Sequence, residues 1–236
     1  MGRFALAPHV HLCVDDGCLV FLDLKADRYW ALDAAQTAGL GHWVPGWPVP
    51  AVMDPKRLEE QSLRLGTILD TLLGRGLIAD ERDGKSAAPV SVATPSGELL
   101  SRPAAPRICA GALTVLAAST VARVGLRLSA FHRVVARVGA RRMTRSGQTG
   151  PLDLHRARGL TENYTVSQLF LLSARDQCLP DSLSLIEYLA WHDIYPDWVF
   201  GVQARPFAAH CWVQHDALVF NDTAEHVRTY TPIMIV

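Results

Sequence analysis

The segment CLPDSLSLIEYLAWHDIYPDWVFGVQARPFAAHCWVQHDALVFND, residues 178–222, predicts the fold of the C-terminal half of the chain. Its first part, up to about residue 192, has apolar residues at helical spacing. The runs DWVFGVQ, AAHCWVQH and LVFND that follow are rich in β-branched and aromatic residues, and we expect them to be strands. Together with TPIMIV at 231–236 they predict helices followed by an antiparallel sheet, which is an α+β order.

The same segment contains a cysteine, a histidine and an aspartate whose chemistry suits a thiol hydrolase. Cys178 lies at the predicted helix start, where the helix N-terminus and a nearby imidazolium lower the pKa of a thiol. Its own backbone N–H would face an oxyanion. His210 shares one strand face with Trp212, whereas Cys211 points to the opposite face. Asp222 ends the next strand run, within reach of the imidazole. Spacing alone leaves two interpretations open: a catalytic triad, or a buried thiol, a core histidine and a turn aspartate.

The remaining sequence predicts further helices and a separate group of strands. We expect a long helical stretch at 107–143 and a helix at 161–177. Near the N-terminus, HVHLCV, CLVFLDL and RYWALD are separated by turns that contain Asp or Gly, and they predict a three-strand meander at 9–33. AAQTAGLGHWV at 34–44 and the leucine-rich segment 55–78 are expected to form helices.

A change in composition between the two groups of elements predicts a domain boundary. Residues 79–106 are rich in Pro, Ser, Gly and Ala, which is typical of a linker with room for one short strand. We therefore predict a first domain at 1–80, a linker at 81–106 and a second domain at 107–236.

Charge and cysteine content argue against several classes of protein. The 23 basic and 23 acidic residues balance, which disfavours a general nucleic-acid binder. Five cysteines without CxxC spacing favour a reduced, cytoplasmic protein with neither a disulfide framework nor a zinc site. The most apolar run, 108–122, is shorter than the ~20 residues that span a bilayer, and we interpret it as a buried helix, with a membrane-associated helix as the alternative. The sequence has no secretory h-region and no Gly-rich phosphate loop. We expect no stable membrane insertion, no metal and no cofactor.

Three separated motifs, CLPDSLSLIEYL, FGVQARPFAAHCWV and VFND, resemble the C-terminal peptidase domain of lasso-peptide biosynthesis B proteins. These are the leader peptidases of microcin-type lasso-peptide maturation, and the resemblance covers residues 163–236. It implies a transglutaminase-like (papain-like) fold and a Cys-His-Asp triad. In this sequence it assigns Cys178 as the nucleophile, His210 as the base and Asp222 as the residue that orients the base. With the motifs added to the spacing, we predict this triad.

The sequence departs from the family pattern at four positions near these motifs. They are Asp181 and Gln203, where basic residues are common, Gln214, which replaces a usual Glu, and Cys211, which replaces a usual Ala or Ser. The departures leave the triad intact, but they put in doubt which substrate side chains are read near it. Asn221 is a possible support for the triad. The other histidines of this region are interpreted as surface or turn residues: His192, His215 and His226.

The N-terminal elements resemble the small leader-recognition domains related to the pyrroloquinoline-quinone biosynthesis chaperone. The resemblance covers residues 8–80 and depends on the element order together with DLKADRYWALD and LLGRGLI. It implies a winged-helix-like domain of three strands and three helices, in which an extended peptide joins the free sheet edge as a further strand. A DNA-reading helix-turn-helix would need a basic recognition helix, which LRLGTILDTLLGR is not. The residues expected to contact the peptide come from the third strand and the last helix: Arg28, Tyr29, Trp30, Leu32, Leu65 and Leu69.

Strand alternation leaves part of this assignment open. Because Tyr29 and Trp30 point to opposite faces of their strand, only one of them can line a groove. Simple packing of both side chains is the alternative interpretation.

The two resemblances together imply a peptidase that binds the leader of a ribosomally made lasso-peptide precursor and cuts it from the core. The implied partners are that leader and an ATP-using, asparagine-synthetase-like lasso cyclase that afterwards closes the macrolactam. Two alternatives stay open. One is a transglutaminase-like acyl transferase, which passes the acyl group to an amine instead of water. The other is a non-catalytic chaperone that only binds the precursor, and the intact residue types at 178, 210 and 222 argue against it.

Overall fold

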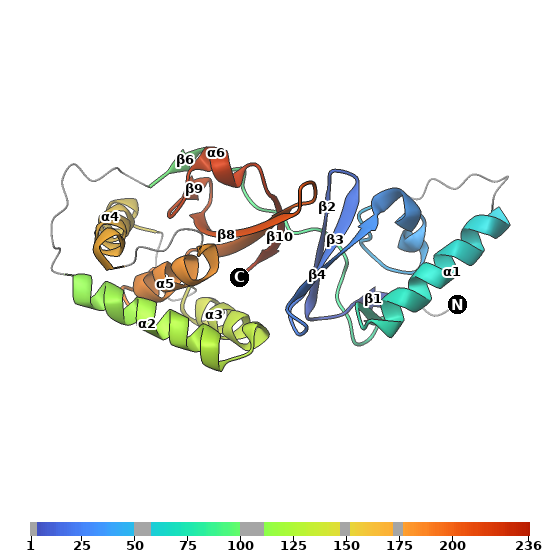
Figure 1. Cartoon of the computed structure of the whole chain (residues 1–236), viewed down its shortest axis with the longest axis horizontal. Coiled ribbons are helices and arrows are strands. Elements are labelled where there is room, and N and C mark those ends of the chain that lie inside the picture. The colour runs from blue at the N-terminus through green and yellow to red at the C-terminus, as the bar shows by residue number, and fades with distance from the viewer. Residues whose placement is uncertain (1–3, 50–57, 100–110, 147–151, 172–176) are drawn as a thin grey trace. The chain divides into compact units, whose positions relative to one another are not determined.

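The computed structural model describes residues 4–49, 58–99, 111–146, 152–171 and 177–236 (Figure 1). The chain divides into two compact units, each with its own hydrophobic core. They comprise residues 1–91, 202–208 and 231–234 in the first unit, and 92–201, 209–230 and 235–236 in the second. The domain limits drawn from composition, at 80 and 107, remain a prediction.

A three-stranded antiparallel sheet opens the first unit. Its strands are β2 (Val10–Asp15), β3 (Cys18–Asp23) and β4 (Arg28–Asp33), in the order β2-β3-β4. The turn between β2 and β3 consists of Asp16 and Gly17 at φ 41° and 71°. Positive φ at both positions gives the two-residue hairpin whose twist matches that of the strands. The predicted meander is confirmed, and β4 is an outer strand of this sheet.

The helical segments of the first unit agree only in part with the sequence. Helix α1 (Leu58–Gly74) lies in the leucine-rich segment where the sequence predicts it, and the start of that segment lies outside the described residues. The prediction of one helix at 34–44 is wrong, because two 3-10 helices form there, η1 (Ala34–Thr37) and η2 (Leu40–His42). Between them Gly39 has the left-handed φ of 98°, which an α-helix does not include.

A second, two-stranded sheet pairs β1 (Phe4–Leu6) with β5 (Ile78–Asp80) in antiparallel register. The core of the unit contains Phe21 from β3, Leu40 from η2 and Leu72 from α1. In the described residues the unit has one α-helix and two 3-10 helices beside its strands. The predicted winged-helix-like arrangement is therefore not confirmed.

Four helices precede the main sheet of the second unit. They are α2 (Ala112–Leu128), α3 (Phe131–Ser146), α4 (Leu154–Leu171) and α5 (Cys178–Ala190). The long helical stretch predicted at 107–143 is divided, because Ser129 has an extended backbone at φ −122° and ψ 142° that ends α2. Helix α4 starts earlier than the predicted residue 161. Its start is capped by the Asp153 carboxylate, which accepts the backbone N–H groups of the first turn at 3.0 and 3.1 Å.

A five-stranded sheet in the order β10-β7-β8-β9-β6 follows these helices. Its strands are β6 (Gly97–Glu98), β7 (Asp197–Gln203), β8 (Ala208–His215), β9 (Leu218–Val219) and β10 (Thr231–Ile235). The predicted strands β7 and β8 are confirmed, whereas LVFND is a strand only at its first two residues. A short helix, α6 (Ala224–Val227), follows β9 and was not predicted. The sheet is mixed, because β9 pairs antiparallel with β8 but parallel with β6. Figure 1 shows α2, α3 and α5 to one side of β8.

Helix α2 carries the described part of the most apolar run. One face, with Val115, Ala118 and Ala122, is buried, whereas Leu113 and Leu128 are exposed. The predicted buried helix is thus buried along one side. In the described part of the chain, we find no helix with the length and apolar character that crossing a membrane requires.

Because Gly201 in β7 has no side chain, Trp212 and Tyr230 can pack directly against its backbone. A Cβ atom built there would lie 2.9 Å from the Trp212 ring and 2.9 Å from Cβ of Tyr230. We expect Gly201→Ala to lower the free energy of unfolding by about 1–3 kcal/mol, because a ring and a backbone-fixed atom must both move. The control is Gly159→Ala in α4, where a new Cβ meets nothing within 4 Å. There alanine should stabilise the helix by roughly 0.5–1 kcal/mol. Urea unfolding of both variants checks the prediction, and an unchanged midpoint for Gly201→Ala would contradict it.

Candidate active site

Cys178 is the first residue of α5 and is half-buried. Gln177 caps this helix with a non-helical backbone, and its Oε1 accepts a hydrogen bond of 2.7 Å from Nη1 of Arg123 in α2. Pro180 lies in the first turn, where its missing N–H removes no helical bond. The sequence prediction that Cys178 starts a helix is therefore confirmed. A thiol in this place faces the positive end of the helix dipole.

His210 on β8 points to the carboxylate of Asp222, which lies between β9 and α6. The distance from His210 Nε2 to Asp222 Oδ2 is 2.6 Å, and both side chains are mostly shielded from solvent. Trp212 stacks on the imidazole at a centroid distance of 6.0 Å and an interplanar angle of 20°, and Tyr230 lies 5.1 Å away. The aromatic neighbours therefore restrict the tilt of the imidazole ring, and the hydrogen bond to Asp222 restricts its rotation. Asn221 accepts the backbone N–H of Val213 at 2.8 Å and so fixes the loop to β8.

Hydrogen bonding with Cys211 and His210, together with burial, sets the protonation of the Cys178 thiol. The bond to Cys211, opposed by burial and supported by the bond to His210, lowers the pKa of Cys178 from 9.0 to about 4. Burial lowers the pKa of His210, but the hydrogen bonds to Asp222 and Cys178 outweigh it and raise that pKa to about 9. Between these values the stable form is a thiolate beside an imidazolium, which is the reactive state of a thiol hydrolase.

The Asp222 carboxylate stays ionised beside the imidazolium. Burial alone would raise its pKa, but donors on both oxygens lower it below the ordinary range. They are His210, His226 and the backbone N–H of Thr223, the last at 2.7 Å from Oδ1. Asp222 is therefore placed to orient His210 and to balance its charge.

Comparison with known protein families decides the class of this site. A family model described as the transglutaminase-like superfamily matches residues 118–235, a range that includes Cys178, His210 and Asp222. The chain belongs to the transglutaminase-like superfamily. No curated protein and no solved structure matched it. A transglutaminase-like domain indicates a cysteine-protease-like or acyltransferase-like activity, both of which proceed through an acyl-thioester.

Cys211 is part of this transglutaminase-like site in a way that the sequence does not predict. Strand alternation places it on the face opposite His210, yet both Cys211 and His210 lower the pKa of Cys178. The Cys211 side chain is buried, at 2% exposure, and its Sγ lies 3.2 Å from Oγ of Ser182. Trp198 Nε1 in turn donates to Ser182 Oγ at 2.8 Å. This buried chain of polar groups fixes the Cys211 thiol, whose own pKa is raised by the bond to Cys178 and by burial.

Removing the Cys211 thiol should weaken the thiolate of the transglutaminase-like site. In Cys211→Ala we expect the pKa of Cys178 to rise from about 4 toward its ordinary value, because a hydrogen bond to the anion is lost. A charged hydrogen bond contributes about 1.5–3 kcal/mol, so alkylation of Cys178 by iodoacetamide near pH 4 should slow by about tenfold or more. Cys211→Ser keeps a donor and should stay close to the wild type. Equal alkylation rates for Cys211→Ala and wild type from pH 4 to 7 would contradict this role.

Sequence reasoning missed one further residue of the transglutaminase-like site, His226. The sequence suggests a surface histidine, and the side chain is indeed half exposed, but its Nδ1 lies 2.8 Å from Asp222 Oδ2. The only sequence signal is the spacing of four residues between Asp222 and His226 at a helix start, which brings two side chains to one face.

These three residues bring together potential metal ligands, but their bonding argues against a metal centre. Single ligand atoms of His210, Asp222 and His226 lie within 4.8 Å of one another. Nε2 of His210 and Nδ1 of His226 each donate a proton to the carboxylate, so neither of these two nitrogens has a lone pair free for a cation. We assign no metal to this cluster.

The residues predicted to bind a leader lie in the first unit and are only partly accessible. Leu65 is 5% exposed and belongs to the core, and Trp30, Leu32 and Leu69 pack against the same core. The Arg75 guanidinium lies 3.9 Å above the Trp30 ring. The two remaining residues lie on β4: Arg28 is exposed and Tyr29 is half-buried. Their role in leader binding stays a prediction.

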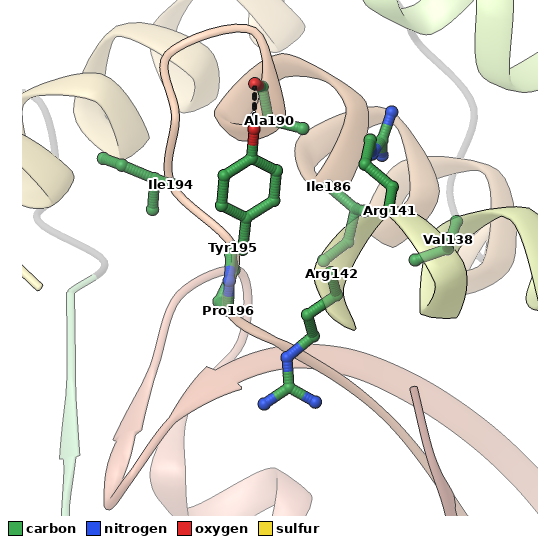
Figure 2. A pocket seen from close by; sticks show the side chains of 8 residues that line it. All are labelled: Val138, Arg141, Arg142, Ile186, Ala190, Ile194, Tyr195 and Pro196. Carbon is green, nitrogen blue, oxygen red and sulfur yellow. Dashed lines mark hydrogen bonds between the residues drawn. The ribbon is translucent and has the colours of Figure 1, made fainter. Parts of the chain in front are cut away.

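A small cavity between α3 and α5 is separate from the residues of the site (Figure 2). Figure 2 shows Val138, Arg141 and Arg142 of α3 around it, with the Tyr195 hydroxyl turned toward the Ala190 carbonyl at 3.4 Å. Its volume of about 10 Å³ is the space of one water. It is too small for a substrate.

Proposed function

We propose that the chain is a cytoplasmic leader peptidase of lasso-peptide maturation, a B protein in which leader recognition and proteolysis are fused. The observation that carries the proposal is the pairing of Cys178 with a His210 that is bonded to Asp222 at 2.6 Å. The family match supports a cysteine-protease-like or acyltransferase-like enzyme, and the motifs CLPDSLSLIEYL, FGVQARPFAAHCWV and VFND support the narrower class.

The proposed reaction has two steps that use the same three side chains. The Cys178 thiolate attacks the scissile carbonyl, and the backbone N–H at the start of α5 faces the developing oxyanion. The His210 imidazolium gives its proton to the leaving amine of the core peptide as the C–N bond breaks. Water then attacks the thioester as His210 takes a proton from it, the C–S bond breaks and returns the Cys178 thiolate, and the leader leaves with a new carboxylate. Asp222 keeps the imidazole oriented through both steps.

Leader capture is assigned to the first unit in this proposal. Strand β4 is an outer strand of its sheet, and an extended peptide is able to add to such an edge through backbone hydrogen bonds. Exposed Arg28 and half-buried Tyr29 on β4 would then select side chains of the leader. The proposed partner after cleavage is the ATP-using cyclase, which joins the freed amine of the core to a carboxyl side chain.

The test uses a purified protein and a precursor peptide encoded near its gene, with and without the cyclase and ATP. Mass spectrometry should find separate leader and core from wild type, and an intact peptide from Cys178→Ala. A peptide without its leader is the control for recognition and should be cut far more slowly. If the precursor binds but stays whole under all conditions, the non-catalytic chaperone is the better description. Cleavage that persists in Cys178→Ala would refute the mechanism.

An acyl transferase is the second candidate, because the superfamily match supports it equally. The same thioester would then react with an amine in place of water. Cleavage in H₂¹⁸O with and without added hydroxylamine separates the two. A leader labelled with ¹⁸O at its new carboxylate indicates hydrolysis, whereas an amide-linked product in the absence of hydroxylamine indicates transfer.

A further inference from the structure

The Asp222 carboxylate is enclosed by three hydrogen-bond donors. Oδ1 accepts the Thr223 backbone N–H at 2.7 Å, and Oδ2 accepts from His210 Nε2 at 2.6 Å and from His226 Nδ1 at 2.8 Å. An ionised carboxylate has no proton to give, so both ring nitrogens must be donors. For His226 this requires a proton on Nδ1, which the neutral ring provides as well as the charged one.

The His226 ring is held firmly although 49% of the side chain is exposed. Its backbone N–H bonds Oγ1 of Thr223, the N-cap of α6, and its carbonyl accepts both the N–H and the hydroxyl of Thr229 at 3.0 and 2.7 Å. The ring lies edge-on to Tyr230, with centroids 5.4 Å apart, and 4.9 Å from the ring of His210. The donor nitrogen is therefore presented to Asp222 from a fixed support.

Asp222 needs such a support because of where it lies. It belongs to the irregular stretch 220–223 between β9 and α6, which is part of neither a strand nor a helix. The regular backbone hydrogen bonds of such an element therefore do not help to position its side chain. The Thr223 N–H holds Oδ1 only, and rotation of the carboxylate would still move Oδ2 away from His210. The bond from His226 blocks that rotation.

We propose that His226 is a positioning residue of the reactive site, which holds the Asp222 carboxylate in the orientation that His210 requires. This inference rests on the proposed function only in that Cys178 and His210 are the reactive pair. It does not depend on which peptide is the substrate.

The first test measures alkylation of Cys178 by iodoacetamide, followed in the peptide that carries it by mass spectrometry. We expect His226→Ala to slow alkylation near pH 4, where half of the wild-type thiol is ionised, by roughly tenfold, the effect of losing one hydrogen bond to a charged group. His226→Asn places an amide N–H where Nδ1 was and should stay within about threefold of wild type. Cys18, a half-buried thiol on β3, is the internal reference in the same digest. His215→Ala, a partly exposed histidine on β8 that pairs with Asp216, is the matched control and should leave the rate unchanged.

A double-mutant cycle separates positioning from a general structural effect. If His226 acts through Asp222, then His226→Ala should have no further effect in the Asp222→Ala background. Additive effects, or a full alkylation rate in His226→Ala, would overturn the proposal. Where a precursor is cleaved, the same variants should lower kcat with KM unchanged. Alkylation by iodoacetamide requires no leader peptide. The double-mutant cycle therefore still tests the role of His226 if the protein cuts no lasso precursor.

Discussion

In the proposed peptidase, His210→Gln should lower kcat/KM for the precursor peptide at least about 10³-fold relative to wild type. Glutamine fills a similar volume but neither protonates the leaving amine nor carries the positive charge that stabilises the thiolate. It also removes the partner of Asp222 at 2.6 Å. The loss thus includes both the general acid and part of the nucleophile's activation. Initial rates under single-turnover conditions, with the variant in excess of the peptide, give the effect directly.

The pH dependence of activity tests the role of His210 more specifically than the rate at one pH does. The pKa of Cys178 is lowered to about 4, so the thiolate forms above that pH, and the pKa of His210 is raised to about 9, so the imidazolium persists below that pH. Wild-type activity should therefore form a plateau between the two values and fall on both sides. In His210→Gln the upper limb should vanish, and alkylation of Cys178 should rise only toward the ordinary pKa of a thiol.

The control for both measurements is His215→Gln, the same chemical change five residues further along β8. That side chain is partly exposed, and its Nε2 lies 3.7 Å from a carboxylate oxygen of Asp216. It should keep the plateau and the rate of wild type. A His210→Gln protein that retained a plateau down to pH 5 would show that the thiolate does not depend on the imidazolium.

Trp198→Ala should lower the free energy of unfolding by about 3–5 kcal/mol, the largest stability effect that we expect from one substitution in the second unit. Trp198 is fully buried in β7, and its ring packs on Phe200 at a centroid distance of 4.6 Å. Its Nε1 also donates to Ser182, which is equally buried and would lose that donor. The variant therefore leaves both a cavity and a weakened polar contact next to Cys211.

Trp198→Phe divides this effect into its parts. Phenylalanine keeps most of the ring volume but not the N–H, so about 1–3 kcal/mol should be lost. Trp191→Ala is the control, because that ring is exposed at the end of α5 and should contribute little. Guanidinium unfolding with an unchanged m-value gives the comparison. A loss from Trp198→Ala no larger than from Trp191→Ala would mean that the cavity refills by repacking.

The elements that the sequence predicts well are those with a local, repeated pattern. The meander of β2, β3 and β4 follows from alternating side chains and a two-residue Asp-Gly turn, and α5 follows from the apolar spacing after Cys178. Strands β7 and β8 have the β-branched and aromatic residues of a buried sheet. In each case the signal lies in consecutive residues, so no knowledge of distant partners is required.

The features that the sequence does not predict depend on single backbone positions or on distant partners. Gly39 ends a helical pattern because of its positive φ, and Ser129 divides α2 from α3. The sequence allows one short strand in 79–106 but does not place it, because β6 has only two residues and forms against β9. The roles of Cys211 and His226 likewise become visible only when α5, β8 and α6 are brought together.

The parallel pairing of β6 with β9 has a consequence for the time course of folding. The paired residues, Gly97 with Leu218, are about 120 positions apart along the chain, so this sheet edge forms only after a very long loop has closed. The Glu98 carboxylate in β6 also accepts the N–H of Ala224 at 3.1 Å. The start of α6 can therefore be completed only when β6 has paired with β9. During refolding from urea, the helical signal in circular dichroism should therefore return first. Reactivity of Cys178 should follow with a measurable lag, because the loop that carries Asp222 is completed last.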